Sequence, residues 1–105
     1  MMGTLDGKVA LVTGAGRGIG HGIARRLAQD GAAVILHHGR SAQAARDLAD
    51  EIGAQGGNAS TVGADLADMD AIQAMFETIS QRHPRLDILV NNAGGGSGGM
   101  PRLSD

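Results

Sequence analysis

Residues 13–20 read Thr13-Gly14-Ala15-Gly16-Arg17-Gly18-Ile19-Gly20 and decide the fold of this 105-residue chain. They follow a continuous apolar run at residues 9–12, which is typical of a strand buried on both faces. They open an amphipathic segment over residues 18–30. Glycines in such a turn let main-chain N–H groups approach a pyrophosphate, and a helix N-terminus adds partial positive charge. The stretch therefore predicts a nucleotide-binding turn; the alternative is a glycine-rich turn that only packs closely.

Outward from this turn, short apolar runs alternate with longer amphipathic segments, as in βαβ units with a parallel sheet. We expect strands at residues 9–12, 33–36, 59–63 and 86–90, and helices from Gly18 to about Asp30, from the N-cap Ser41 to about Ile52, and from the N-cap Asp68 to Pro84. In the first helix Ile19, Ile23, Ala24 and Leu27 recur at helical spacing. Right-handed crossovers then favour a Rossmann-type, doubly wound α/β sheet. We expect one partial domain over residues 1–105, with a glycine-rich loop and tail at residues 95–105.

Composition excludes several kinds of partner. A net charge of -2 leaves no basic surplus for nucleic acid. The absence of cysteine excludes disulfides, and the absence of any signal-like or membrane-length apolar run fits a cytoplasmic protein without a membrane partner. His37 and His38 invite a metal hypothesis. Adjacent strand residues point to opposite faces, however, so we expect no metal site.

The glycine spacing points to one family. Ile19 stands where G-x-G-x-x-G needs its third glycine, whereas T-G-x-x-x-G-x-G is met by Thr13, Gly14, Gly18 and Gly20. With this spacing the chain resembles the classical short-chain dehydrogenase/reductase (SDR) family. Three further segments agree with the family pattern: Leu5-Asp6-Gly7-Lys8-Val9-Ala10-Leu11-Val12 before the turn, Asp65-Leu66 after the third strand, and Asn91-Asn92-Ala93-Gly94 after the fourth. The resemblance covers essentially the whole chain.

The resemblance implies an oxidoreductase that acts on a small-molecule carbonyl/alcohol pair with a nicotinamide dinucleotide. The cofactor-binding residues that we carry over or infer are Gly14, Arg17, Gly18, Ile19, Gly20, His38, Arg40, Asp65, Leu66, Asn91, Ala93 and Gly94. Two alternatives stay open. Asp65 could be a loop or N-cap residue, with Asp68 or Asp70 as competitors. Asn91 and Asn92 could serve only to satisfy backbone groups at the strand end.

Charge indicates which dinucleotide is preferred. An NAD site usually carries an acidic residue after the second strand, to accept hydrogen bonds from the ribose hydroxyls. Here His38 occupies that position, Arg40 lies just beyond it, and Arg17 lies in the glycine turn. Because arginine can meet a 2′-phosphate with paired charge-assisted hydrogen bonds, NADP(H) is preferred and NAD(H) stays possible. The alternative is that Arg17 and Arg40 are solvated surface charges.

The resemblance also implies a catalytic Tyr-x-x-x-Lys pair and a serine, further along the chain in family members. This sequence has no tyrosine, and Lys8 precedes the first strand, so no catalytic residue is assigned. We therefore expect this chain to be the N-terminal, cofactor-binding part of such an enzyme. The alternatives are a non-catalytic nucleotide-binding half domain and a truncated gene product without activity. We also expect residues 86–90 to form an apolar sheet edge that favours self-association.

Overall fold

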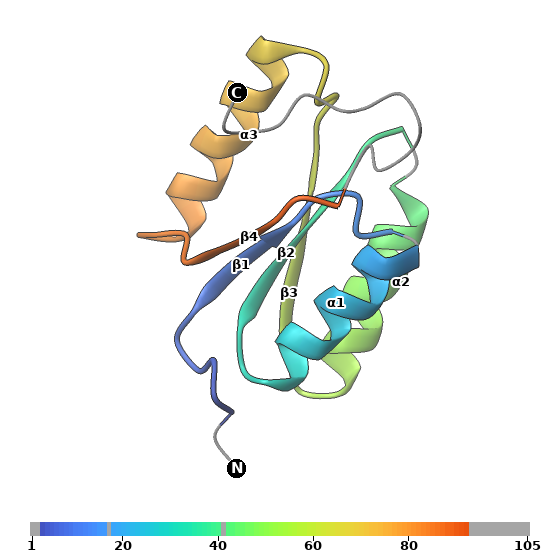
Figure 1. Ribbon diagram of the computed structural model, residues 1–105, viewed down its shortest axis with the longest axis vertical. Helices are drawn as coiled ribbons and strands as arrows, with labels where there is room; N and C mark the ends of the chain where they lie inside the picture. Colours follow the sequence, from blue (N-terminus) through green and yellow to red (C-terminus); the bar gives the residue numbers. More distant parts are fainter. Residues whose placement is uncertain (1–2, 17, 41, 93–105) are drawn as a thin grey trace.

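The computed structural model describes residues 3–16, 18–40 and 42–92. Strands and helices alternate in the order β1 (Val9–Val12), α1 (Gly18–Gln29), β2 (Ala33–His38), α2 (Gln43–Ala54), β3 (Asn58–Gly63), α3 (Met69–Arg82) and β4 (Ile88–Val90). The four strands form one parallel sheet in the order β3-β2-β1-β4. Helices α1 and α2 cover one face of the sheet and α3 covers the other (Figure 1). The predicted Rossmann-type α/β fold is therefore confirmed.

The central strand β1 is buried along its whole length because it has neighbours on both edges and helices on both faces. Alternate residues of β1 and β2 enter two separate hydrophobic clusters, as the two-residue period of a strand requires. The cluster on one face includes Ala10, Val12, Ala24, Ala28, Val34, Leu36, Ala45, Leu48 and Ile52. The other cluster consists of Val9, Leu11, Ile35, Val62, Met75 and Ile79.

Helix α1 turns small residues toward the sheet. Gly20, Ala24 and Ala28 are its buried positions, which lets its backbone approach the strands closely. Ile19, one of the four apolar residues at helical spacing, is instead 75% exposed. The spacing therefore predicted the helix correctly, but Ile19 does not belong to the core.

Both predicted ends of α3 are confirmed. The Asp68 carboxylate accepts hydrogen bonds from the N–H groups of Asp70 and Ala71, at 2.9 and 3.2 Å, and so caps the helix. At the other end His83 is extended (φ −137°, ψ 136°), as expected for the residue before Pro84. At the start of α2, Ala42 is already helical (φ −84°, ψ −20°) and offers no side-chain hydrogen bond, so the predicted cap at Ser41 stays a prediction. Ser41 lies outside the described residues.

Three strands differ in length from the sequence prediction, of which β3 differs by a single residue, since Asn58 pairs with Ala33 of β2. β2 continues to His38 because His37 and His38 pair with Val62 and Gly63 of β3. β4 begins only at Ile88: the Asp87 N–H donates to the Val9 carbonyl at 2.9 Å, but the Val9 N–H donates back to the Asp87 carboxylate, also at 2.9 Å, and not to a main-chain carbonyl. β4 is an edge strand of the sheet over the described residues. In that part of the chain no helix combines the length and the apolar character needed to cross a bilayer.

Candidate functional site

The segments that follow the strands meet at one edge of the sheet, because all four strands are parallel. Strands β2 and β3 lie on one side of β1, whereas β4 lies on the other. The chain direction across the sheet therefore reverses at β1, and such a reversal is where doubly wound proteins bind ligands. The glycine turn at residues 13–20 leaves β1 at this point, and Asn91 and Asn92 leave β4 beside it.

Thr13 joins the glycine turn to the segment after β4. Its main-chain N–H donates to the Val90 carbonyl at 3.0 Å, and its hydroxyl oxygen accepts the Asn92 N–H at 2.9 Å. The hydroxyl also lies 3.3 Å from both the Val90 carbonyl and Asn91 Oδ1. The Asn92 side-chain amide donates in turn to the Gly14 carbonyl at 3.2 Å. The two motifs that the sequence keeps far apart are thus one hydrogen-bonded unit.

Glycine is required in this turn for two different reasons. Gly14 and Gly18 both have φ of +61°, a left-handed conformation that L side chains rarely adopt. Gly20 instead makes a close approach: a Cβ there would lie 2.9 Å from the Gly14 carbonyl oxygen and would collide with the Asn92 amide. At Gly18 the space around such a Cβ is open. The helix thus begins with an uncovered backbone, which can receive a phosphate group.

His37 holds the other side of the turn, and sequence reasoning missed this role. Its ring is buried at 2% exposure, where Nδ1 accepts the Gly14 N–H at 3.0 Å and Nε2 lies 2.9 Å from the Ala64 carbonyl. Its own carbonyl accepts the Ala15 N–H at 3.1 Å. Burial lowers the pKa of His37, the Ala64 carbonyl raises it in part, and the neighbouring His38 lowers it again. His37 is therefore a neutral link between the glycine turn and the segment after β3.

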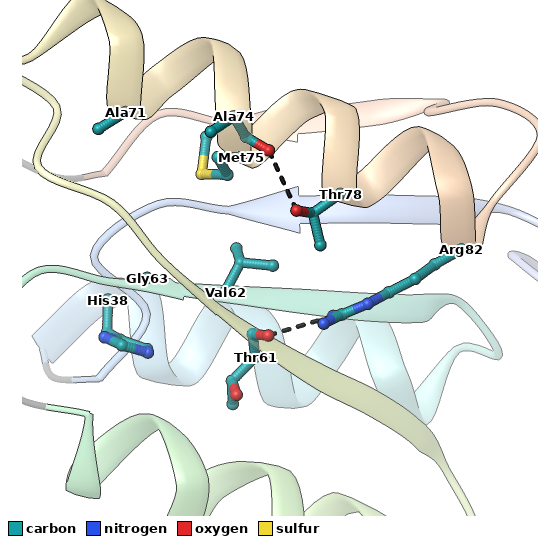
Figure 2. A pocket seen from close by; sticks show the side chains of 9 residues that line it. All are labelled: His38, Thr61, Val62, Gly63, Ala71, Ala74, Met75, Thr78 and Arg82. Atoms are coloured by element: carbon teal, nitrogen blue, oxygen red, sulfur yellow. Dashed lines mark hydrogen bonds between the residues drawn. The ribbon is translucent and has the colours of Figure 1, made fainter.

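His38 points to the opposite face from His37, as expected for neighbours on a strand. Its Nδ1 lies 3.0 Å from the Gly39 carbonyl, and its ring lies so close to Gly63 that a Cβ there would be 2.7 Å from Cε1. The ring borders a cavity of about 390 Å³ between β3 and α3. Figure 2 shows His38 at one end of this cavity and Arg82 at the other, donating to the Thr61 carbonyl. Arg40 is exposed two residues beyond His38.

The remaining predicted site residues lie along the same edge or outside the described residues. Asp65 is exposed, and its carboxylate accepts the Ala67 N–H at 2.9 Å. Leu66 is partly buried against the core cluster on the α3 side. Asn91 is exposed beside the Thr13 hydroxyl. Three predicted residues lie outside the described part of the chain: Arg17, Ala93 and Gly94.

The open alternatives are resolved in part. Asp68, and not Asp65, caps α3, although Asp65 does occupy a local turn through Ala67. Asn92 satisfies backbone groups, as one alternative held, and by doing so fixes the shape of the glycine turn. Within the described residues, no three His, Cys, Asp or Glu side chains are grouped so that they could hold a metal ion.

This geometry is shared with known proteins. The family model for short chain dehydrogenases matches residues 8–105. The chain belongs to the short-chain dehydrogenase/reductase family. Among its SDR relatives, versicolorin reductase from Emericella nidulans is 47% identical over 90 residues, which is 86% of this chain and 34% of that protein. Hydroxynaphthalene reductase from Aspergillus fumigatus is 46% identical over 90 residues, or 86% of this chain and 33% of that protein. The chain thus spans about a third of the length of these relatives.

Solved SDR structures extend the similarity to three dimensions. A metagenomic short-chain oxidoreductase in complex with NADP is 46% identical, with a TM-score of 0.84, and the match covers 96% of this chain and 45% of that one. The angucycline C-6 ketoreductase LanV with bound NADP is 45% identical, with a TM-score of 0.82, over 90% of this chain and 39% of that one. The N-terminal segment of the SDR fold is therefore present here.

Proposed function

We propose that this chain is the cofactor-binding part of an NADP(H)-dependent oxidoreductase that acts on a small-molecule carbonyl/alcohol pair. One observation carries the proposal: the glycine turn is fixed at the switch point of the sheet by Thr13, His37 and Asn92, while its first helical turn stays open. Such a turn offers backbone donors to a diphosphate. Relatives that are named reductases, and neighbours solved with NADP, support the same reading.

The residues present fit a nicotinamide dinucleotide. Gly18, Ile19 and Gly20 would receive the diphosphate at the start of α1, where no acidic residue stands in the first helical turn, and Gly14, whose N–H is held by His37, would line the turn beside it. Asp65 and Leu66, and Asn91 with the following Ala93 and Gly94, would lie along the rest of the dinucleotide. When bound, the reduced nicotinamide supplies a hydride to a carbonyl carbon. No residue of this chain matches the family's Tyr-x-x-x-Lys proton donor.

We further propose that the site prefers NADP(H) to NAD(H). β2 ends at His38, and the residues that follow it are Gly39 and the exposed Arg40, so no carboxylate stands where a 2′-phosphate would be repelled. His38 Nδ1 donates to the Gly39 carbonyl, because that oxygen can only accept. Arg40, and Arg17 of the glycine turn, would supply charge-assisted hydrogen bonds.

The test is a comparison of the dissociation constants of NADP⁺ and NAD⁺ by calorimetry on the full-length protein. We expect tighter binding of NADP⁺. His38→Asp should reverse the preference, and Arg40→Gln should weaken NADP⁺ by about 10–100-fold, the worth of a hydrogen bond to a charged group, with little change for NAD⁺. The matched control is Arg26→Gln, because Arg26 is an exposed arginine near the far end of α1, paired with Asp30. Equal or tighter binding of the cofactor that lacks the 2′-phosphate would refute the preference. Binding without turnover of any carbonyl would indicate a non-catalytic nucleotide-binding module.

A further inference from the structure

His37 connects two segments of the cofactor site that are distant in sequence. Gly14, in the glycine turn, donates its N–H to Nδ1 at 3.0 Å, and Ala64, at the end of β3, places its carbonyl 2.9 Å from Nε2. The ring is buried at 2% exposure. Few conformational alternatives are open to a side chain held at both nitrogens in a packed interior. The protonation state of the His37 ring therefore determines which hydrogen bonds it can make to the two segments.

The two partners fix the tautomer of His37. A backbone N–H can only donate, so Nδ1 must offer its lone pair to Gly14. A backbone carbonyl can only accept, so Nε2 must carry the proton that is donated to Ala64. A second proton on the ring would occupy Nδ1 and set an N–H against the N–H of Gly14. The hydrogen bond would be lost and two donors would face each other in a buried space.

The charged groups around His37 leave its neutral form favoured. His38, its neighbour on β2, lowers the pKa of His37 when charged, in the same direction as burial. On the segment from β3 into α3, Asp65 and Asp68 are the acidic residues that come first, and both accept local backbone N–H groups. Arg17, on the glycine turn, lies outside the described residues. Because Nδ1 accepts the Gly14 N–H, protonation of His37 at Nδ1 would break the hydrogen bond that holds the glycine turn.

We propose that His37 is a positioning residue that keeps the glycine turn in its binding shape only while it is neutral, so that protonation weakens binding of NADP⁺ and NAD⁺ alike. The proposal rests on the proposed function, since it concerns the same dinucleotide site. Affinity falls with the fraction of protein in the competent form. The dissociation constant of each cofactor therefore rises toward about tenfold per pH unit once the pH is below the pKa of His37.

The test measures dissociation constants of NAD⁺ and NADP⁺ on the full-length protein from about pH 8 to about pH 5, where histidines titrate. NAD⁺ is the decisive probe, because NADP⁺ carries a phosphate that itself titrates near pH 6, by analogy with other phosphate monoesters. We expect both constants to rise at acid pH. His37→Asn keeps an oxygen that can accept the Gly14 N–H and cannot be protonated, so it should bind at neutral pH and lose the acid-side rise in the NAD⁺ constant. His83→Asn, a histidine at the end of α3, should keep the wild-type profile.

The outcomes separate this inference from the proposed function. Absence of dinucleotide binding at about pH 8 would overturn both. Binding at that pH with an NAD⁺ constant that stays flat on acidification, or that rises equally in His37→Asn, would overturn the role of His37 alone. Nitrogen chemical shifts of the imidazole give a check on the unmodified protein: we expect protonated Nε2 and bare Nδ1. The opposite tautomer in a protein that binds the dinucleotide would also refute the inference.

Discussion

Replacement of Gly20 by alanine tests whether the glycine turn is held by its contact with the segment after β4. The new Cβ would lie 2.9 Å from the Gly14 carbonyl oxygen and 3.0 Å from Asn92 Cγ, with the side-chain nitrogen of Asn92 still closer. Overpacking of this kind costs about 1–3 kcal/mol, and loss of the bond from Asn92 to Gly14 costs about 0.5–1.5 kcal/mol more. The helix propensity of alanine returns at most about 1 kcal/mol. We therefore expect Gly20→Ala to lower the free energy of unfolding by about 0.5–3.5 kcal/mol.

The matched control lies on the same helix. Gly22 is exposed, and a Cβ there would meet nothing within 4 Å. Gly22→Ala should therefore raise the free energy of unfolding by about 0.5–1 kcal/mol, because only the backbone entropy of glycine is removed. Both variants are compared by urea denaturation and by NADP⁺ titration on the full-length protein. Gly20→Ala should also weaken NADP⁺, whereas Gly22→Ala should not. Equal stability of the two variants would refute the claim that the turn and Asn92 are in contact.

Three other predictions concern the same turn and its supports. Thr13→Val should destabilise the protein by about 1–3 kcal/mol, because the part-buried Asn92 N–H loses its acceptor, whereas Thr13→Ser should retain most of the stability; urea denaturation of both decides. Gly18→Ala should cost about 1–2 kcal/mol of stability, since φ is +61° there, and a stability equal to wild type in the same assay would contradict the backbone geometry. Burial lowers the pKa of His37 in the folded protein below its ordinary value of 6.5. Between pH 6.5 and the lowered pKa, His37 therefore binds more protons in the unfolded chain than in the folded one. The contribution of His37 to stability should be complete above about pH 6.5 and should fall as the pH drops toward the lowered pKa; His37→Asn should lack this portion of the pH dependence, and identical slopes would contradict it.

Most of the fold could be predicted from local pattern alone. The run at residues 9–12 is apolar without a break because β1 is buried on both faces, and Asp68 signals the start of α3 because a cap acts within one helical turn. The errors in strand length arise where pairing with a distant segment determines the end of the strand. β2 runs on to His38 because β3 lies alongside it, and β4 starts late because Asp87 reaches across to β1. The local sequence of β2 does not reveal its pairing with β3, and the local sequence of β4 does not reveal the contact of Asp87 with Val9.

The site was predictable as a set of motifs but not as a set of contacts. The spacing T-G-x-x-x-G-x-G indicated the turn, and the two asparagines indicated its neighbour, yet Thr13 and Asn92 were not named as cofactor-site residues. Their bond joins positions 79 apart in the chain, and the bond from Gly14 to His37 joins positions 23 apart. His37 was considered only as a metal ligand, because a histidine in a strand gives no local sign of which backbone groups its ring will meet. The roles of Asp65 and Arg40 toward a cofactor stay predictions.

The contacts of the turn show how a short loop would be prepared for the proposed binding of a diphosphate. Ordering the backbone of one residue costs about 1–2 kcal/mol, and a flexible turn would have to meet that cost on binding. Here Thr13 and Gly14 are already fixed by groups from β2 and from the end of β4, which the sheet itself holds in register. Under the proposed function the dinucleotide would find its donors in place, and its affinity would depend on residues that never touch it. A change at Asn92 or His37 should therefore alter the binding of both cofactors equally, whereas a change at Arg40 should alter only the choice between them. That separation distinguishes the residues that shape the site from the residue that selects its ligand.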